Sequence, residues 1–244
     1  QCAAAVVLGE LKVRDSFVVK ELGHLLGNGQ DRHVKGYALA ALEKIASRES
    51  IPFVLPILAG DSELREQAVR ALAVLGAGVA RELAARFKTA SAAERRGINL
   101  VLARVRGGDA TRLLLEALQD DDEAVVEETL QGIRREMKTA SPRDKRAFLT
   151  QIKAFLGGRA VKGNKRAKTA ALRALGFLDD LSAEALALSY LGPAHDQTIR
   201  HAALVALRTM PRAPRASESL LKKLLPLLSE TDFAHIVAPT LDVL

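Results

Sequence analysis

The sequence predicts an all-α protein built from repeated pairs of antiparallel helices. Its 244 residues are 48% hydrophobic but only 4% aromatic, and Trp is absent. Ala and Leu dominate the apolar residues, and both favour helices over strands. The second observation is an apolar pattern that returns about every thirty residues, and the third is a short polar side chain placed before most copies of that pattern.

The repeated apolar pattern, called the stripe below, is clearest in segments 31–45 and 61–75. Its members follow the spacing i, i+4, i+7, i+8, i+11, which places them on one face of a helix. In the copy that follows, Glu94 stands at the first apolar position. The stripe residues are Val34, Ala38, Ala41, Leu42, Ile45; Leu64, Ala68, Ala71, Leu72, Leu75; Ile98, Val101, Leu102, Val105; Ala167, Ala171, Ala174, Leu175, Leu178; and Ile199, Ala203, Ala206, Leu207, Met210.

The stripe also fits both ends of the sequence. At the start its members are Ala4, Val7, Leu8 and Leu11, and at the end they are Phe233, Val237, Leu241 and Leu244. The sequence is therefore predicted to begin and end inside repeat helices, as a segment of a longer protein would.

Helix start signals agree with the stripe. Side chains that can cap a helix N-terminus lie three residues before the first stripe position: Asp31, Asp61, Ser91, Asn164 and Asp196. A shorter apolar helix is expected before each stripe helix, around residues 17–26, 51–58, 79–87, 113–118, 148–156, 181–191 and 220–228. The predicted unit is thus two antiparallel helices in about thirty residues, separated by Gly-containing or polar turns.

These helix pairs resemble HEAT repeats of the short bacterial type, also called phycobilisome-lyase-type repeats. The motif D-x-x-L-R-x-x-A-x-x-A-L stands at 61–72, with an Ile variant at 196–207 and a Lys variant at 31–42. The resemblance covers nearly the whole chain and implies one armadillo/HEAT-like α-solenoid domain over 1–244. That fold is a right-handed superhelix of antiparallel helix pairs, here about seven to eight repeats with truncated ends, whose neighbours share one elongated core.

In this family the second helix of each pair usually lines the concave face, where partners bind. The cationic and His candidates for that face, opposite the stripe, are Arg70, Arg96, Arg173, His201 and Arg208. The alternative is a solvated helix face, because exposed charge needs no special explanation. A further set of cations, directly after the first stripe residue, is expected to make a ladder of Asp-to-Arg contacts between repeats: Lys35, Arg65, Arg95, Lys168 and Arg200.

The repeat is interrupted between Leu102 and Leu175, where 73 residues separate positions that two regular repeats would place about ten residues closer. Within this interval, residues 134–173 hold 13 Lys or Arg and two acidic residues. We therefore expect an irregular basic insertion around 134–170. The preceding helix fits the stripe in two registers, through Val126, Leu130, Ile133 and Met137 or through Val125, Thr129 and Ile133.

The Gly-rich segment 157–168 is the strongest candidate for a specific contact in this insertion. As a mobile loop it could meet phosphates or an acidic partner through Arg159, Lys162, Lys165 and Arg166. The alternative is an interhelical loop kept in solution by its charge, docked on the acidic residues at 120–128.

No arrangement of residues indicates catalysis. The five His show no metal-ligand spacing, Asp120 to Asp122 fit a helix cap better than a cation site, and the single Cys2 has no apparent base partner. No catalytic, cofactor-binding or metal-binding residue is therefore expected, and no apolar run reaches the ~18 residues of a membrane span.

The leading hypothesis is a non-catalytic scaffold or adaptor that binds another protein or peptide through its concave face and the 157–168 segment. A nucleic-acid or other polyanion binder using the basic block 134–173 is the second hypothesis. A regulatory or spacer module of a larger protein, with a catalytic domain elsewhere, is the third. The lone Cys favours a reducing, cytoplasmic location.

Overall fold

The computed structural model describes residues 1–27, 31–105, 107–211 and 218–244, and these residues form helices and turns with no strand among them. The predicted all-α class is confirmed. The chain divides into two compact units. Unit 1 comprises Gln1–Leu114 and Asp122–Thr129, and unit 2 comprises Leu115–Asp121 and Leu130–Leu244.

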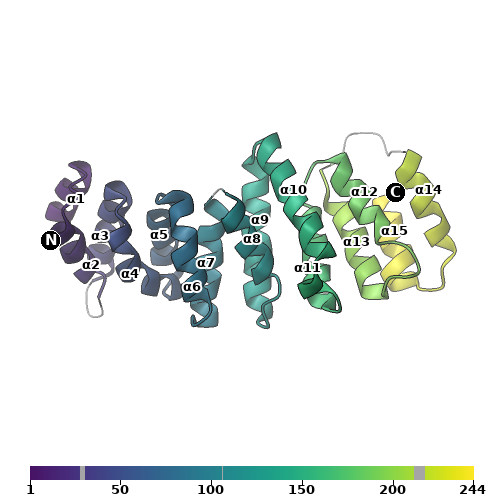
Figure 1. The fold of residues 1–244 in the computed structure, drawn as a ribbon, viewed down its shortest axis with the longest axis horizontal. Helices are drawn as coiled ribbons and strands as arrows, with labels where there is room; N and C mark the ends of the chain where they lie inside the picture. Colours follow the sequence, from purple (N-terminus) through teal and green to yellow (C-terminus); the bar gives the residue numbers. More distant parts are fainter. Residues whose placement is uncertain (28–30, 106, 212–217) are drawn as a thin grey trace. The chain divides into compact units, whose positions relative to one another are not determined.

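Unit 1 is built from short helices that precede longer ones. The longer helices α1, α3, α5 and α7 pack against one another in succession (Figure 1). The elements of this unit are α1 (Cys2–Glu10), α2 (Ser16–His24), α3 (Arg32–Ile45), η1 (Arg48–Ser50), α4 (Ile51–Val54), η2 (Leu55–Ala59), α5 (Ser62–Ala73), η3 (Gly76–Val79), α6 (Ala80–Phe87) and α7 (Ala92–Arg104). Helices α8 (Gly108–Ala117) and α9 (Glu123–Thr139) contribute residues to both units.

In unit 2, helices α11, α13 and α15 pack in succession. Its elements are α10 (Pro142–Gly157), η4 (Arg159–Val161), α11 (Lys165–Leu175), α12 (Leu181–Ser189), α13 (Gln197–Thr209), α14 (Glu218–Leu224), η5 (Leu225–Ser229), the π-helix η6 (Phe233–Val237) and α15 (Ala238–Val243).

The predicted capping residues all cap a helix. Each side chain accepts a hydrogen bond from a backbone N–H in the first turn, satisfying a donor that the helix leaves unpaired. The helices concerned are α3, α5, α7, α11 and α13, capped by Asp31, Asp61, Ser91, Asn164 and Asp196. The shorter helices expected before them are also observed, so the two-helix unit is confirmed as local structure.

The stripe forms the core of each unit, where Leu42, Leu72 and Leu175 have no measurable exposure. Glu94 is accommodated at an apolar position because Arg86 of α6 forms two hydrogen bonds with its carboxylate. Arg86 Nε donates to one carboxylate oxygen at 2.6 Å and Nη2 donates to the other at 3.0 Å. The hydrogen bond to Glu94 raises the pKa of Arg86 above its ordinary value. A buried acid is thus matched by a bidentate cation.

The predicted stripe register is wrong at the start of the chain and only partly right at its end. In α1 the buried residues are Ala5 and Gly9, whereas Val7 and Leu11 are exposed. Gly9 lies directly on Ala41 of α3, where a Cβ at Gly9 would come within 2.8 Å of the Ala41 Cα. Close helix approach therefore selects the small residues of α1 rather than its largest ones.

At the other end, Leu241 and Leu244 are exposed, whereas Val237 is buried as predicted, together with Ile236, Thr240 and Val243. The π-helix η6 supplies the reason, because an i→i+5 turn rotates the following residues relative to an α-helical pattern. The side chain of Phe233 lies outside the described residues.

The register of α9 is settled in favour of Val125, Thr129 and Ile133, which are all buried, and Leu130 is buried beside them. Thr129 occupies a core position because its hydroxyl donates to Val125 O at 2.7 Å. The hydroxyl oxygen of Thr129 in turn accepts a hydrogen bond from Asn99 Nδ2 of α7 at 2.7 Å. Asp122 caps this helix through Ala124 N and Val125 N, as expected for the acidic triplet.

The expected irregular segment 134–170 is largely helical. The extra residues lengthen α9 and α10 to 17 and 16 residues. Gly157 ends α10, and α11 begins at Lys165, so only a 3-10 turn and a few residues separate these helices. The basic residues are therefore presented mainly on helix surfaces rather than on a long loop.

Three of the five cations expected to form an Asp-to-Arg ladder, all of them Arg, make different contacts. Their guanidinium groups donate to carbonyl oxygens at the end of the preceding short helix: Arg65 to Leu58 and Gly60, Arg95 to Ala90, and Arg200 to Leu191. Arg200 also pairs with Glu230 at 2.5 Å. For Arg65 and Arg200, the contact is thus largely with unpaired helix-end carbonyls rather than with a capping Asp.

The capping carboxylates are instead reached by the residue that directly follows the cap one helix pair earlier. Arg32 contacts Asp61 at 3.3 Å, and Lys165 contacts Asp196 at 2.6 Å. The ladder therefore exists at these two steps, but it starts from a different position in the repeat.

Candidate functional site

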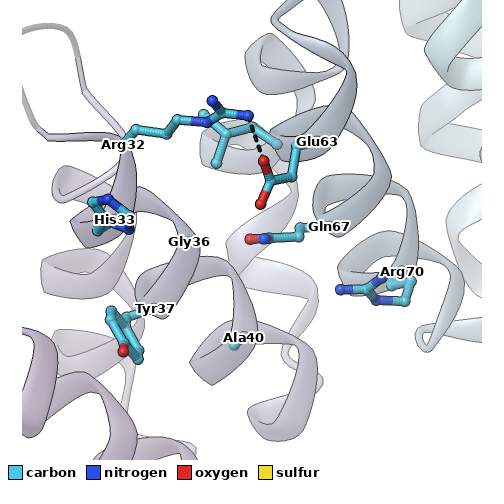
Figure 2. Close-up of a pocket in the computed structure, with 9 residues that line it drawn as sticks. Arg32, His33, Gly36, Tyr37, Ala40, Glu63, Gln67 and Arg70 are labelled. Atoms are coloured by element: carbon cyan, nitrogen blue, oxygen red, sulfur yellow. Dashed lines mark hydrogen bonds and ion pairs between the residues drawn. The ribbon is translucent and has the colours of Figure 1, made fainter.

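A groove of about 360 Å³ lies between α3 and α5 of unit 1. This volume falls in the range of small ligand pockets, about 300–1,000 Å³. One wall comes from α3 and the other from α5, as Figure 2 shows. The lining residues are Arg32, His33, Gly36, Tyr37, Ala40, Glu63, Leu64, Gln67 and Arg70.

Gly36 of α3 leaves room at the groove for the side chain of Gln67. Gln67 extends from α5 toward Gly36 (Figure 2), and a Cβ at Gly36 would lie 3.3 Å from Gln67 Oε1. This oxygen is shielded from solvent and has no hydrogen-bond partner among the described residues. Leu64 contributes a nearly buried apolar patch. The groove thus combines small and apolar surface with an amide group that has unused hydrogen-bonding capacity.

The charges at the groove are already balanced within the protein. Arg32 donates to Glu63 at 2.5 Å, and Arg70 Nε lies 3.5 Å from the carboxylate of Glu43. The pKa of the nearby Asp61 carboxyl is lowered. The main cause is the hydrogen bond that this carboxyl accepts from the backbone N–H of Leu64, and the positive charge of Arg32 adds to it. The groove consequently has a polar rim of mixed sign rather than a field of one sign.

Among the predicted binding residues, the structure places Arg70 in this groove. Arg96 lies on α7 and is half-buried, and its Nε is shielded from solvent without a hydrogen-bond partner among the described residues. Arg173 is half-buried in the last turn of α11. Arg96 and Arg173 do not line the groove.

The two predicted residues of α13 contact the C-terminal helices of unit 2. His201 Nδ1 lies 3.0 Å from His235 O, and Arg208 pairs with Asp242 at 2.8 Å. Arg208 therefore joins neighbouring helices through an ion pair, a contact that neither the binding hypothesis nor the solvated-face alternative predicts.

The four cations of the 157–168 segment fall into two pairs. Arg159 and Lys162 are exposed at η4. Lys165 is paired with Asp196, and Arg166 Nη2 donates to Asp121 O at 3.4 Å. The contact of Arg166 agrees with the alternative in which this segment docks on its acidic neighbour.

Most of the groove was not identified from sequence. Arg32, His33, Gly36, Tyr37 and Gln67 were not predicted as binding residues, although Tyr37 is 46% exposed. The available signal was Gly36, because an isolated Gly inside a helical pattern usually has a packing or functional reason. The position of Gln67 across the groove depends on helix packing and has no sequence signal.

The chain matches no protein-family model, and no curated protein matches it significantly. Across residues 1–27, 31–105, 107–211 and 218–244, no group of three or more His, Cys, Asp or Glu could hold a metal ion. None of the helices in those ranges is long and apolar enough to cross a membrane.

Proposed function

We propose that this protein is a non-catalytic scaffold or adaptor that holds a segment of a partner polypeptide in the groove between α3 and α5. The observation that carries the proposal is the groove itself, in which Gln67 lies against Gly36 beside Leu64 and Tyr37. Tyr37 supplies an exposed aromatic ring with a hydroxyl, a residue type enriched at protein interfaces.

A polypeptide suits this groove better than a strongly charged ligand. Arg32 and Arg70 face carboxylates of the same unit, so an anionic ligand would have to displace existing ion pairs. The Gln67 amide can both donate and accept, which matches a peptide bond. A segment crossing Gly36 would place its backbone near that amide while its side chains contact Leu64 and Tyr37.

We further propose that the chain is a HEAT-like α-solenoid in which the groove belongs to the concave surface. The support is the packing of α1, α3, α5 and α7 in succession in unit 1, and of α11, α13 and α15 in unit 2. Capping side chains at equivalent positions of these helices add to it. Stacking of helix pairs that complete one another's cores is the defining property of solenoid repeats.

The test uses a displayed library of random peptides selected against the intact protein. We expect enriched peptides whose affinity falls about tenfold or more when Gly36→Leu fills the groove or Tyr37→Ala removes the ring. Gly36→Leu should not unfold α3, because Leu has a higher helix propensity than Gly. Circular dichroism and the thermal midpoint monitor folding.

The matched control is Ala40→Ser, a small change at the edge of the same groove, with Thr150→Ala in unit 2 as a distant control. Both should leave peptide affinity within about twofold. Selected peptides that bind equally well to Gly36→Leu and to the wild type would show that the groove is not the binding site.

A further inference from the structure

A second groove, of about 540 Å³, lies between α10 and α12 of unit 2. Its lining residues are Leu149, Lys153, Leu181, Ser182, Ala185, Leu186 and Ser189. The residues from α12 are small or apolar. Leu181 is 78% exposed, the largest exposure of any large hydrophobic residue among those the structure describes. A groove of this composition favours an apolar occupant.

This groove is open because the two helices that form its walls are not closely packed. The partner helices α11 and α13 pack tightly against each other, whereas α10 and α12 do not. Ser182, Ala185 and Ser189 are exposed on the α12 wall and are too short to close the gap. The open space therefore runs along the helix axis of α12, a shape that matches another helix laid alongside.

Positive charge lies along α10, where Lys153 lines the groove and two Arg residues precede it on the same helix. Arg143, Arg146 and Lys153 are exposed and lie at i, i+3 and i+10, which places them on one side of α10. Arg146 Nε donates to Pro142 O of its own helix. For Arg143 and Lys153, no ion pair is recorded with any described residue, and unit 2 carries almost all of the formal net charge of +7.

The acidic side chain directly before α12 already accepts a hydrogen bond within the protein. Asp180 caps this helix by accepting from Ser182 N at 2.7 Å. Lys153 is the charged residue that lines the groove, and it favours a partner with acidic groups beside its apolar surface.

We propose that the groove between α10 and α12 binds an acidic amphipathic helix of a partner protein. The apolar face of that helix would cover Leu149, Leu181 and Leu186, and its acidic flank would face Lys153 and Arg146. Nucleic acid fits less well, because a phosphate backbone gains nothing from an apolar groove and base stacking requires aromatic rings, which do not line this groove. This site is independent of the α3–α5 groove.

The probe is a fluorescein-labelled peptide of about 15 residues with Leu at i, i+3, i+4 and i+7 and Glu on the flanks. Two control peptides share its length: a scrambled one without separated faces, and one with Lys in place of Glu. Binding to the intact protein is measured by fluorescence anisotropy. The variants are Lys153→Glu and Ala185→Glu, both at exposed groove positions, and Lys138→Glu, which makes the same charge change on the exposed surface of α9.

We expect the acidic amphipathic peptide to bind and both groove variants to weaken it about tenfold or more, with Lys138→Glu changing affinity by no more than about twofold. Gly36→Leu should leave this binding unchanged, so the two grooves are tested separately. Equal binding of the scrambled peptide, equal loss in Lys138→Glu, or tighter and salt-sensitive binding of duplex DNA that competes with the peptide would each overturn the proposal.

Discussion

The cations of unit 1 and those of α10 in unit 2 have different surroundings. In unit 1, cations of the longer helices pair with acidic residues on the neighbouring longer helix: Lys44 with Glu10, Arg32 with Glu63, Arg70 with Glu43, and Arg104 with Glu66. On α10, Arg143 and Lys153 form no ion pair with a described carboxylate, and both are exposed. Charge in unit 1 thus connects successive helix pairs, whereas charge on α10 is directed to solvent.

This difference shows that the function of a cation in a repeat protein depends on the residue one repeat away. Arg70 and Arg143 are both exposed or half-exposed Arg side chains on helices, and composition does not distinguish them. What distinguishes them is an acidic residue at the matching position of the adjacent helix. Removing a cation without such a neighbour should change the free energy of unfolding very little, and its charge is available to a partner.

The largest effect should come from the internal pairing of unit 1. Arg86→Met removes the partner of Glu94 and leaves a carboxylate buried at a stripe position. Because an uncompensated buried charge is strongly destabilising, we expect the thermal midpoint to fall by more than about 5 °C at neutral pH.

The matched variant is Arg86→Met combined with Glu94→Leu, which restores an apolar residue to the stripe. Replacing a buried ion pair by apolar residues often leaves stability unchanged. The double variant should therefore regain most of the decrease in thermal midpoint caused by Arg86→Met. A double variant as unstable as Arg86→Met would mean that Arg86 supports unit 1 through its packing, and that the buried carboxylate of Glu94 is not the cause.

A smaller loss of stability is expected when low pH protonates the capping carboxylates. The pKa of Asp196 is lowered, first by the hydrogen bond from Lys165 and then by the backbone N–H of Thr198. Because the folded pKa lies below its ordinary value of 3.8, the ionised group stabilises the fold above that value. This contribution disappears as the pH falls below about 5 toward the lowered pKa.

The measurement compares thermal midpoints of the wild type and Asp196→Asn from about pH 7 to about pH 3. Asn remains a good helix cap but cannot ionise, so the variant should be less stable at neutral pH and its midpoint should approach that of the wild type in acid. Asp61→Asn provides the equivalent test in unit 1. Parallel curves would show that these carboxylates do not contribute to the acid sensitivity.

Local structure was predictable because it depends on neighbouring residues. The caps at Asp61 and Asp196, the stripe helices of the chain interior and the short helices before them follow from side-chain spacing alone. The registers at the two chain ends were not predictable in this way. At Gly9 the buried face depends on contact with Ala41 of another helix, and after η6 it depends on a π-turn.

The candidate groove was less predictable than the fold. Arg70 was identified because it lies opposite the stripe, but Gly36 and Gln67 form a groove only when α3 and α5 lie side by side. Similarly, the basic segment was recognised by composition, yet the irregular insertion expected around 134–170 is mostly helix because α9 and α10 absorb the extra residues. Sequence patterns thus locate side chains on a helix, whereas grooves depend on the distance between helices.

The smallest effect on stability is expected on α10. Replacing Arg143, Arg146 and Lys153 together with Gln should change the free energy of unfolding by no more than about 0.5 kcal/mol per site, because these side chains are exposed. Urea denaturation measures this, with Arg208→Gln as the comparison because Arg208 is paired with Asp242. Fewer like charges in unit 2 could also offset any loss. If the triple variant is instead much less stable than Arg208→Gln, the α10 cations have partners inside the fold. They would then be unavailable to an acidic helix, and the contrast between the cations of unit 1 and those of α10 would disappear.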